Sequence, residues 1–174
     1  MTRLAGFVMG AAFVVGMATG CARAPAPIAA TPQAHPHTHN ASDHNHARGH
    51  MLMASDGTTE ALLTAHLSSK TGNELDVFVE RKGRPFAVAA TTMTALAKTP
   101  AGEDKRIAFE CAPRDERPSN EPDDVCSHFV AKAPWMKTGE LLLVKADLPV
   151  SERKDASTFV WREFEAHRYA HHVE

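Results

Sequence analysis

Short runs of alternating apolar and polar residues recur from residue 55 onward, and this pattern constrains the fold most. In one such run Leu75, Val77 and Val79 alternate with Asp76, Phe78 and Glu80. Successive side chains of a β-strand point to opposite faces, so each run places its apolar residues on one face of a sheet. No segment carries an apolar stripe at helical spacing longer than two turns. The pattern therefore predicts an all-β domain.

Seven strands are predicted between turn sequences rich in Gly, Pro and Asn. They cover residues 61–68, 75–80, 86–97, 107–111, 125–131, 140–148 and 157–166. Seven short strands at this spacing are typical of an immunoglobulin-like β-sandwich, which we expect over residues 55–174. Its core is predicted to contain the large aromatic side chains Phe109, Phe129, Phe159 and Trp161.

The first twenty residues read as an export signal. Arg3 is followed by an uncharged apolar run too short for a confident membrane span, which is typical of a signal peptide. The sequence Ala18-Thr19-Gly20-Cys21 resembles the lipobox of bacterial lipoproteins, although Ala18 stands where Leu is more common. The resemblance implies cleavage before Cys21 and lipidation of Cys21, which would anchor the protein to a membrane of the cell envelope, facing the periplasm or the outside. The alternative is an ordinary secretory signal, or an uncleaved anchor.

Residues 21–54 are predicted to be a disordered tether, rich first in Ala and Pro and then in His. Six of the 11 histidines lie within 16 residues: His35, His37, His39, His44, His46 and His50. A segment without bulky apolar residues buries too little surface to fold. His-rich tracts bind transition metals, because imidazole suits Cu, Zn and Ni, and the following Met51 and Met53 would favour Cu(I). The alternative is a polar spacer that binds ions weakly.

Cys111 and Cys126 flank a charged, Pro-rich loop, and two interpretations remain open. Paired cysteines of an exported protein favour a disulfide, although strand alternation places the two side chains on different faces. The other interpretation is a metal site in which Cys126 and His128 join C-terminal histidines. His167, His171 and His172 are the candidates, because His167 and His171 share a face in a strand or a helix.

The C-terminal domain also resembles small exported bacterial proteins that accompany heavy-metal efflux and copper handling in the periplasm. The similarity lies in Cys126-Ser127-His128-Phe129-Val130-Ala131-Lys132-Ala133-Pro134-Trp135, in Trp161 and Phe164, and in Tyr169-Ala170-His171-His172. It implies metal handling, with an envelope metal-efflux system as a partner.

Two classes of function are disfavoured. The formal net charge of −2 gives no electrostatic attraction to nucleic acid. The motifs of common hydrolases, phosphate-binding enzymes and thiol oxidoreductases are missing, so we do not expect an enzyme. The sequence therefore predicts an envelope lipoprotein that binds Cu, Zn or Ni as a buffer, sensor or delivery module. The alternative is a structural or protein-interaction domain whose His-rich segment is only a spacer.

Overall fold

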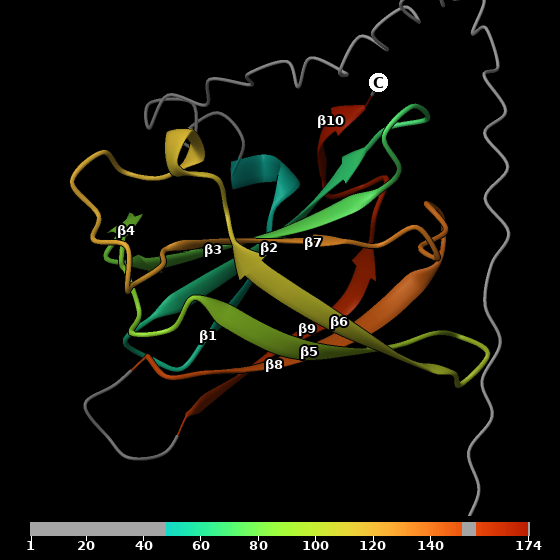
Figure 1. Ribbon diagram of the computed structural model, residues 1–174. Helices are drawn as coiled ribbons and strands as arrows, with labels where there is room; N and C mark the ends of the chain where they lie inside the picture. The colour runs from blue at the N-terminus through green and yellow to red at the C-terminus, as the bar shows by residue number, and fades with distance from the viewer. Residues whose placement is uncertain (1–47, 151–155, 174) are drawn as a thin grey trace, which may run out of the picture. The chain divides into compact units, whose positions relative to one another are not determined.

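The computed structural model describes residues 48–150 and 156–173 (Figure 1). The strands are β1 (Leu52–Ser55), β2 (Glu60–Leu67), β3 (Glu74–Arg81), β4 (Arg84–Pro85), β5 (Thr92–Lys98), β6 (Asp104–Cys111), β7 (His128–Lys132), β8 (Leu141–Leu148), β9 (Ser157–Glu165) and β10 (Ala170–Val173). Two short 3-10 helices, η1 (Arg48–His50) and η2 (Arg114–Glu116), accompany them, and these described ranges contain no α-helix. The prediction of an all-β domain is confirmed.

All ten strands belong to one sheet in the order β1-β2-β3-β7-β6-β5-β8-β9, with β10 beside β2 and β4 beside β3. The neighbours are antiparallel, except that β10 runs parallel to β2. The sheet curls until β9 approaches β1 and β2, and Trp161 Nε1 donates a hydrogen bond of 3.0 Å to the carbonyl of Ala61 across this junction. The result is a nearly closed barrel (Figure 1).

The seven-stranded immunoglobulin-like sandwich is not confirmed, because a sandwich consists of two sheets and the hydrogen-bonded ladder here is continuous. Each predicted segment overlaps one of β2, β3, β5, β6, β7, β8 and β9. The additional strands β1, β4 and β10 have four residues or fewer, too few for alternation to be recognised. β1 begins at Leu52, before the predicted domain boundary at residue 55.

The predicted aromatic core is confirmed. Phe109, Phe129, Phe159 and Trp161 are each at most 1% exposed. Each sits on a strand with its ring toward the inside of the curled sheet, where alternate Leu, Val and Ala side chains of the other strands surround it. The alternation in the sequence therefore identified the inner face of the barrel correctly.

Asp56 ties the turn between β1 and β2 to the start of β9. Its Oδ1 accepts hydrogen bonds from the backbone amides of Thr58 (2.9 Å) and Thr59 (2.7 Å), and its Oδ2 accepts one from Ser157 Oγ (2.8 Å). Slight burial acts to raise the pKa of Asp56, but these hydrogen bonds outweigh it and lower the pKa from 3.8 to about 2. The ionised carboxylate therefore stabilises the junction at which the barrel closes.

An Asp56→Asn variant tests this contribution. A carboxyl whose pKa is lowered on folding stabilises the protein above about pH 4, and this stabilisation is lost as the pH falls to about 2. At pH 7 we expect the free energy of unfolding of the variant to be lower by about 1 kcal/mol or less, because solvent screens an exposed carboxylate. Urea unfolding between pH 2 and pH 7 measures the free energy of unfolding of the variant and of the unchanged chain. The difference between the two should become smaller toward pH 2. A gap independent of pH would show that the charge contributes nothing.

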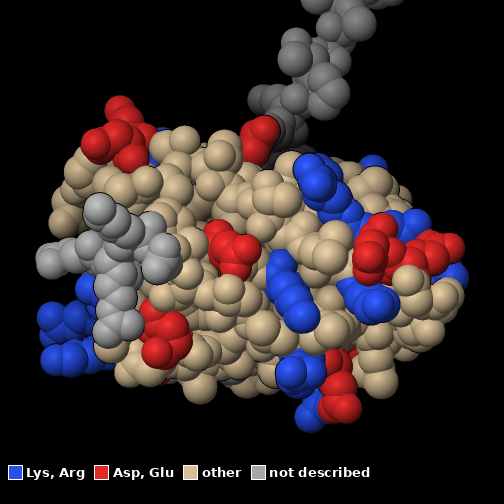
Figure 2. Space-filling model, turned by 90° about the horizontal axis from the view of Figure 1, so that it is seen from below, with Lys and Arg blue, Asp and Glu red and all other residues tan. Residues whose placement is uncertain are grey.

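The surface seen from below carries Lys and Arg interspersed with Asp and Glu (Figure 2). Charges of both signs are also exposed on β5 and β8, where Lys98, Lys145 and Asp147 lie. No helix in the described part of the chain is long and apolar enough to cross a membrane.

Candidate functional site

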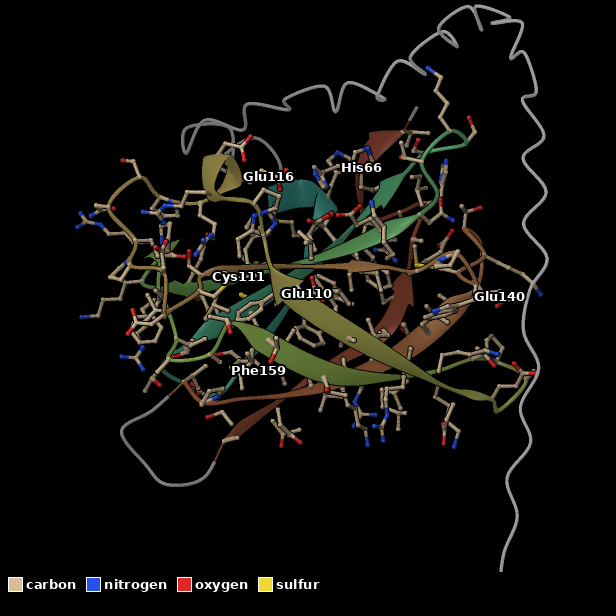
Figure 3. All side chains as sticks on the ribbon, viewed as in Figure 1. His66, Glu110, Cys111, Glu116, Glu140 and Phe159 are labelled. Carbon is tan, nitrogen blue, oxygen red and sulfur yellow. A yellow bond between two sulfur atoms is a disulfide. The ribbon has the colours of Figure 1, made fainter. Side chains whose placement is uncertain are left out.

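The outer face of β2, β3 and β7 is polar, yet much of it is buried. Directly opposed residues of neighbouring strands share a face, so Thr64 lies beside Asp76, and Phe78 lies beside His128. Thr64, Asp76 and His128 are each at most 6% exposed. Helix η1 and the loop of residues 112–127, here named the covering loop, lie over them. His66 and Glu116 are on this side of the sheet, where β10 also lies (Figure 3).

A buried ion pair occupies the β3–β7 part of this face. His128 Nε2 lies 3.0 Å from Asp76 Oδ1, and His128 Nδ1 lies 3.3 Å from the backbone carbonyl of Glu116. Each ring nitrogen therefore faces an oxygen that accepts hydrogen bonds. Phe78 stacks on the same ring with centroids 4.1 Å apart. His128 therefore has a structural environment, with neither nitrogen presenting a lone pair to a metal ion.

The covering loop is held to the barrel by a second buried ion pair. Arg117 and Glu121 are joined at 3.1 Å, with side chains only 8% and 3% exposed. Glu121 also accepts hydrogen bonds from the backbone amide and the hydroxyl of Ser127, immediately before β7. These contacts hold Glu116 over His128, where burial raises the pKa of the Glu116 carboxyl. The charge of His128 opposes this rise, and the charge of Asp76 adds to it.

A disulfide joins Cys111 to Cys126 and closes the base of the covering loop. The predicted disulfide is thus confirmed, and the alternative in which Cys126 and His128 ligate a metal ion is wrong, because a disulfide sulfur is not a thiolate. Strand alternation misled the prediction about faces. Cys126 precedes β7 and pairs with Val88 in an isolated bridge, so it does not follow the alternation of that strand.

One group of three potential metal ligands has its ligand atoms within 4.8 Å of one another among the described residues. It consists of Cys111, Glu121 and Cys126. The disulfide uses both sulfurs, and Glu121 is already bonded to Arg117 and Ser127. This group therefore stabilises the covering loop and is not a metal site.

Three histidines lie near Thr64, which is directly opposite Asp76 on the same face of the sheet. Thr64 Oγ1 lies 2.6 Å from the carbonyl of Tyr169, 3.1 Å from the carbonyl of His50 and 3.3 Å from His171 Nδ1. The ring of His171 packs edgewise against that of His66, with centroids 5.9 Å apart. We name His50, His66 and His171 the histidine cluster. The alternating pattern of β2 predicts an exposed His66, but this residue is half-buried against His171.

The structure divides the other predicted metal ligands. Cys21, His35, His37, His39, His44 and His46 lie outside the described residues. His128 pairs with Asp76, away from the histidine cluster. A turn over residues 166–169 separates His167 from His171, so neither a common strand nor a helix carries this pair. The backbone of His172 pairs with that of His66. Met51 is buried and Met53 is 55% exposed, so the two thioethers face different surroundings.

Sequence reasoning missed Thr64, Asp76 and Glu116. Asp76 and Thr64 occupy polar positions of alternating strands, and neither was predicted as a site residue. The covering segments η1 and 112–127 bury them instead, and their contacts depend on residues far away in the sequence. A signal for Glu116 was present only as one of several charges in a loop interpreted as solvated.

The arrangement offers two kinds of chemistry on one face. Asp76 and His128 pair with each other, whereas the rings of His66 and His171 pack edgewise beside the end of the His-rich tract. Comparison with known proteins adds no relationship to this geometry. No family model, no curated protein and no solved structure matches the chain.

Proposed function

We propose that this protein is a lipid-anchored protein of the bacterial envelope that binds a transition metal ion, namely Cu, Zn or Ni, as a buffer, sensor or delivery module. The signal sequence and lipobox of residues 1–21 support the anchor and the envelope location. The six histidines of residues 35–50 support the choice of metal, because imidazole is a ligand for all three ions.

One observation carries the proposal. The His-rich tract ends at His50, whose carbonyl lies 3.1 Å from Thr64 Oγ1, and the same hydroxyl lies 3.3 Å from His171 Nδ1. The tract therefore meets the barrel at a place where further histidines are concentrated.

Calorimetric titration of the full chain in detergent with Zn²⁺, Ni²⁺ and Cu²⁺ tests the proposal. We expect dissociation constants well below 0.1 mM for at least one ion, equivalent to more than roughly 5.5 kcal/mol of binding free energy. A variant with His35, His37, His39, His44 and His46 replaced by Asn should bind fewer equivalents. No ion binding tighter than about 0.1 mM would overturn the proposal and favour the structural or interaction domain with a spacer.

A matched control keeps the histidines and changes their polar neighbours. A variant with Thr38, Asn40, Ser42 and Asn45 replaced by Ala alters the same segment without removing an imidazole. We expect it to bind as many equivalents as the unchanged chain. An equal loss in both variants would show that the segment, and not its histidines, accounts for the binding.

A further inference from the structure

We propose that helix η2 of the covering loop (Arg114–Glu116) is a pH-sensitive flap over the Asp76–His128 pair, and that the Glu116 carboxyl operates it. The flap lies against the barrel when Glu116 is protonated and lifts when Glu116 ionises. This inference goes beyond the proposed function and does not depend on metal binding.

The chain on either side of η2 is anchored, whereas η2 itself is held weakly. On one side, the Ala112 N–H donates a hydrogen bond of 2.8 Å to the carbonyl of His128. On the other side, Arg117 is bonded to Glu121 at 3.1 Å. Within the described part of the chain, one hydrogen bond joins η2 to a strand, that of the Glu116 carbonyl with His128 Nδ1, and at 3.3 Å it is long. A small movement of η2 between its anchors therefore breaks few contacts.

A small cavity under the flap keeps its lower side from close packing. The cavity has a volume of about 20 Å³, close to the size of one water molecule. Glu116 and Pro118 line it from the covering loop, and Glu80 and His128 line it from the strands. Glu116 therefore lies at a gap between the loop and the sheet, on the side of the barrel where Figure 3 shows it.

Most of the charges around Glu116 have its own sign. The titratable and charged groups that face it are Asp76, Glu74 and Glu80 on β3, His128 on β7, and Asp115, Arg117 and Glu121 on the covering loop. Strand β4 contributes the uncharged Pro85 to the same cavity. Arg117 is paired with Glu121, which leaves His128 as the cation that opposes the remaining carboxylates. A negative charge on Glu116 is therefore poorly compensated while the flap is closed.

The sign of the pH dependence follows from the burial of Glu116. Burial raises the pKa of its carboxyl above 4.5, the charge of His128 lowers it, and the charge of Asp76 raises it further. A carboxyl of this kind stabilises the closed flap fully below about pH 4.5, and this stabilisation is lost as the pH rises through the raised pKa. Lifting η2 returns the carboxylate to water. Loss of the His128 proton at higher pH removes the opposing charge and acts in the same direction.

The test measures the access of solvent to His128 between about pH 4.5 and about pH 7.5. A neutral gadolinium chelate in solution accelerates the relaxation of ring protons that come near the surface, and His128 is 4% exposed under the closed flap. For the full chain in detergent, we expect the relaxation enhancement at the His128 ring to increase several-fold as the pH rises. The Trp161 ring, 1% exposed in the core, should show no change, which separates flap movement from unfolding.

Glu116→Gln replaces the carboxyl by an uncharged amide of nearly the same size. We expect the enhancement at His128 in this variant to keep its low value of mild acid over the whole pH range. Asp115→Asn is the matched control, because it removes an exposed carboxylate from the neighbouring residue of η2. This control should retain the increase at His128.

The carboxyl carbon chemical shift of Glu116 provides a second measurement. It should titrate with a midpoint above pH 4.5 that coincides with the change at His128. Three results would each overturn the flap: an equal increase at His128 in the Glu116→Gln variant, no increase in the unchanged chain, or a parallel increase at Trp161.

Discussion

Replacement of both Cys111 and Cys126 by Ala is expected to lower the free energy of unfolding by about 3 kcal/mol. The disulfide spans a sequence separation of 15, and a cross-link closing a loop of this length restricts the unfolded chain by about that amount. Cys126 is also fully buried, so its truncation removes core contacts in addition. Urea unfolding at pH 7 of the variant and the unchanged chain, without reductant, measures the difference.

Reduction provides the control for this experiment. Reductant should destabilise the unchanged chain by a similar amount and have no effect on the double variant. Loss of the disulfide should also destabilise the covering loop locally, because the disulfide closes the base of this loop, which places Glu116 over His128. We expect faster amide hydrogen exchange at Ser127, whose N–H is bonded to Glu121. Unreduced, folded protein in which Cys111 and Cys126 both react with a thiol reagent would contradict the disulfide.

His128→Ala is expected to cost roughly 3–5 kcal/mol of folding stability, the usual effect of removing one partner of a buried ion pair. The change leaves the Asp76 carboxylate, 8% exposed, without the imidazole that lies 3.0 Å away. It also removes the ring that stacks on Phe78 and the donor to the Glu116 carbonyl. The comparison is made by denaturant unfolding at pH 7.

A double-mutant cycle separates the ion pair from the loss of packing. Asp76→Asn should be destabilising by itself, but Asp76→Asn combined with His128→Ala should cost clearly less than the sum of the single changes. The reason is that the double variant contains no unpaired buried charge. Additive effects within about 0.5 kcal/mol would show that Asp76 and His128 do not interact.

Much of the barrel could be predicted because its longer strands repeat a simple pattern. In β3, Leu75, Val77 and Val79 alternate with Asp76, Phe78 and Glu80, and in β8 apolar and polar residues alternate from Val144 to Leu148. Such a pattern identifies a strand and its inner face. β1 and β10 have four residues each and were missed as strands. The pairing of strands was also beyond prediction, because alternation does not say which strands are neighbours. The continuous ladder through β3, β7, β6 and β5 follows from contacts between distant parts of the chain.

The candidate site also has features that could be predicted from the sequence and features that could not. The sequence shows that histidines are frequent near residue 50 and residue 171, because residue types alone reveal this. That His50 and His171 meet at Thr64 depends on β10 pairing in parallel with β2, across more than 100 residues. His128 shows the opposite outcome. Its residue type suggested a metal ligand, but Asp76 and the Glu116 carbonyl occupy both of its nitrogens.

The sequence by itself determined the strand class, the inner aromatic residues Phe109, Phe129, Phe159 and Trp161, and the chemical character of the two histidine-rich ends. These properties are local, because they depend on side-chain type and on the period of two along a strand. Only the tertiary structure decided that the sheet is one curled ladder, that Cys111 and Cys126 are bonded, and which histidines are neighbours. These properties are non-local, since each joins residues that the chain brings together only when the barrel closes.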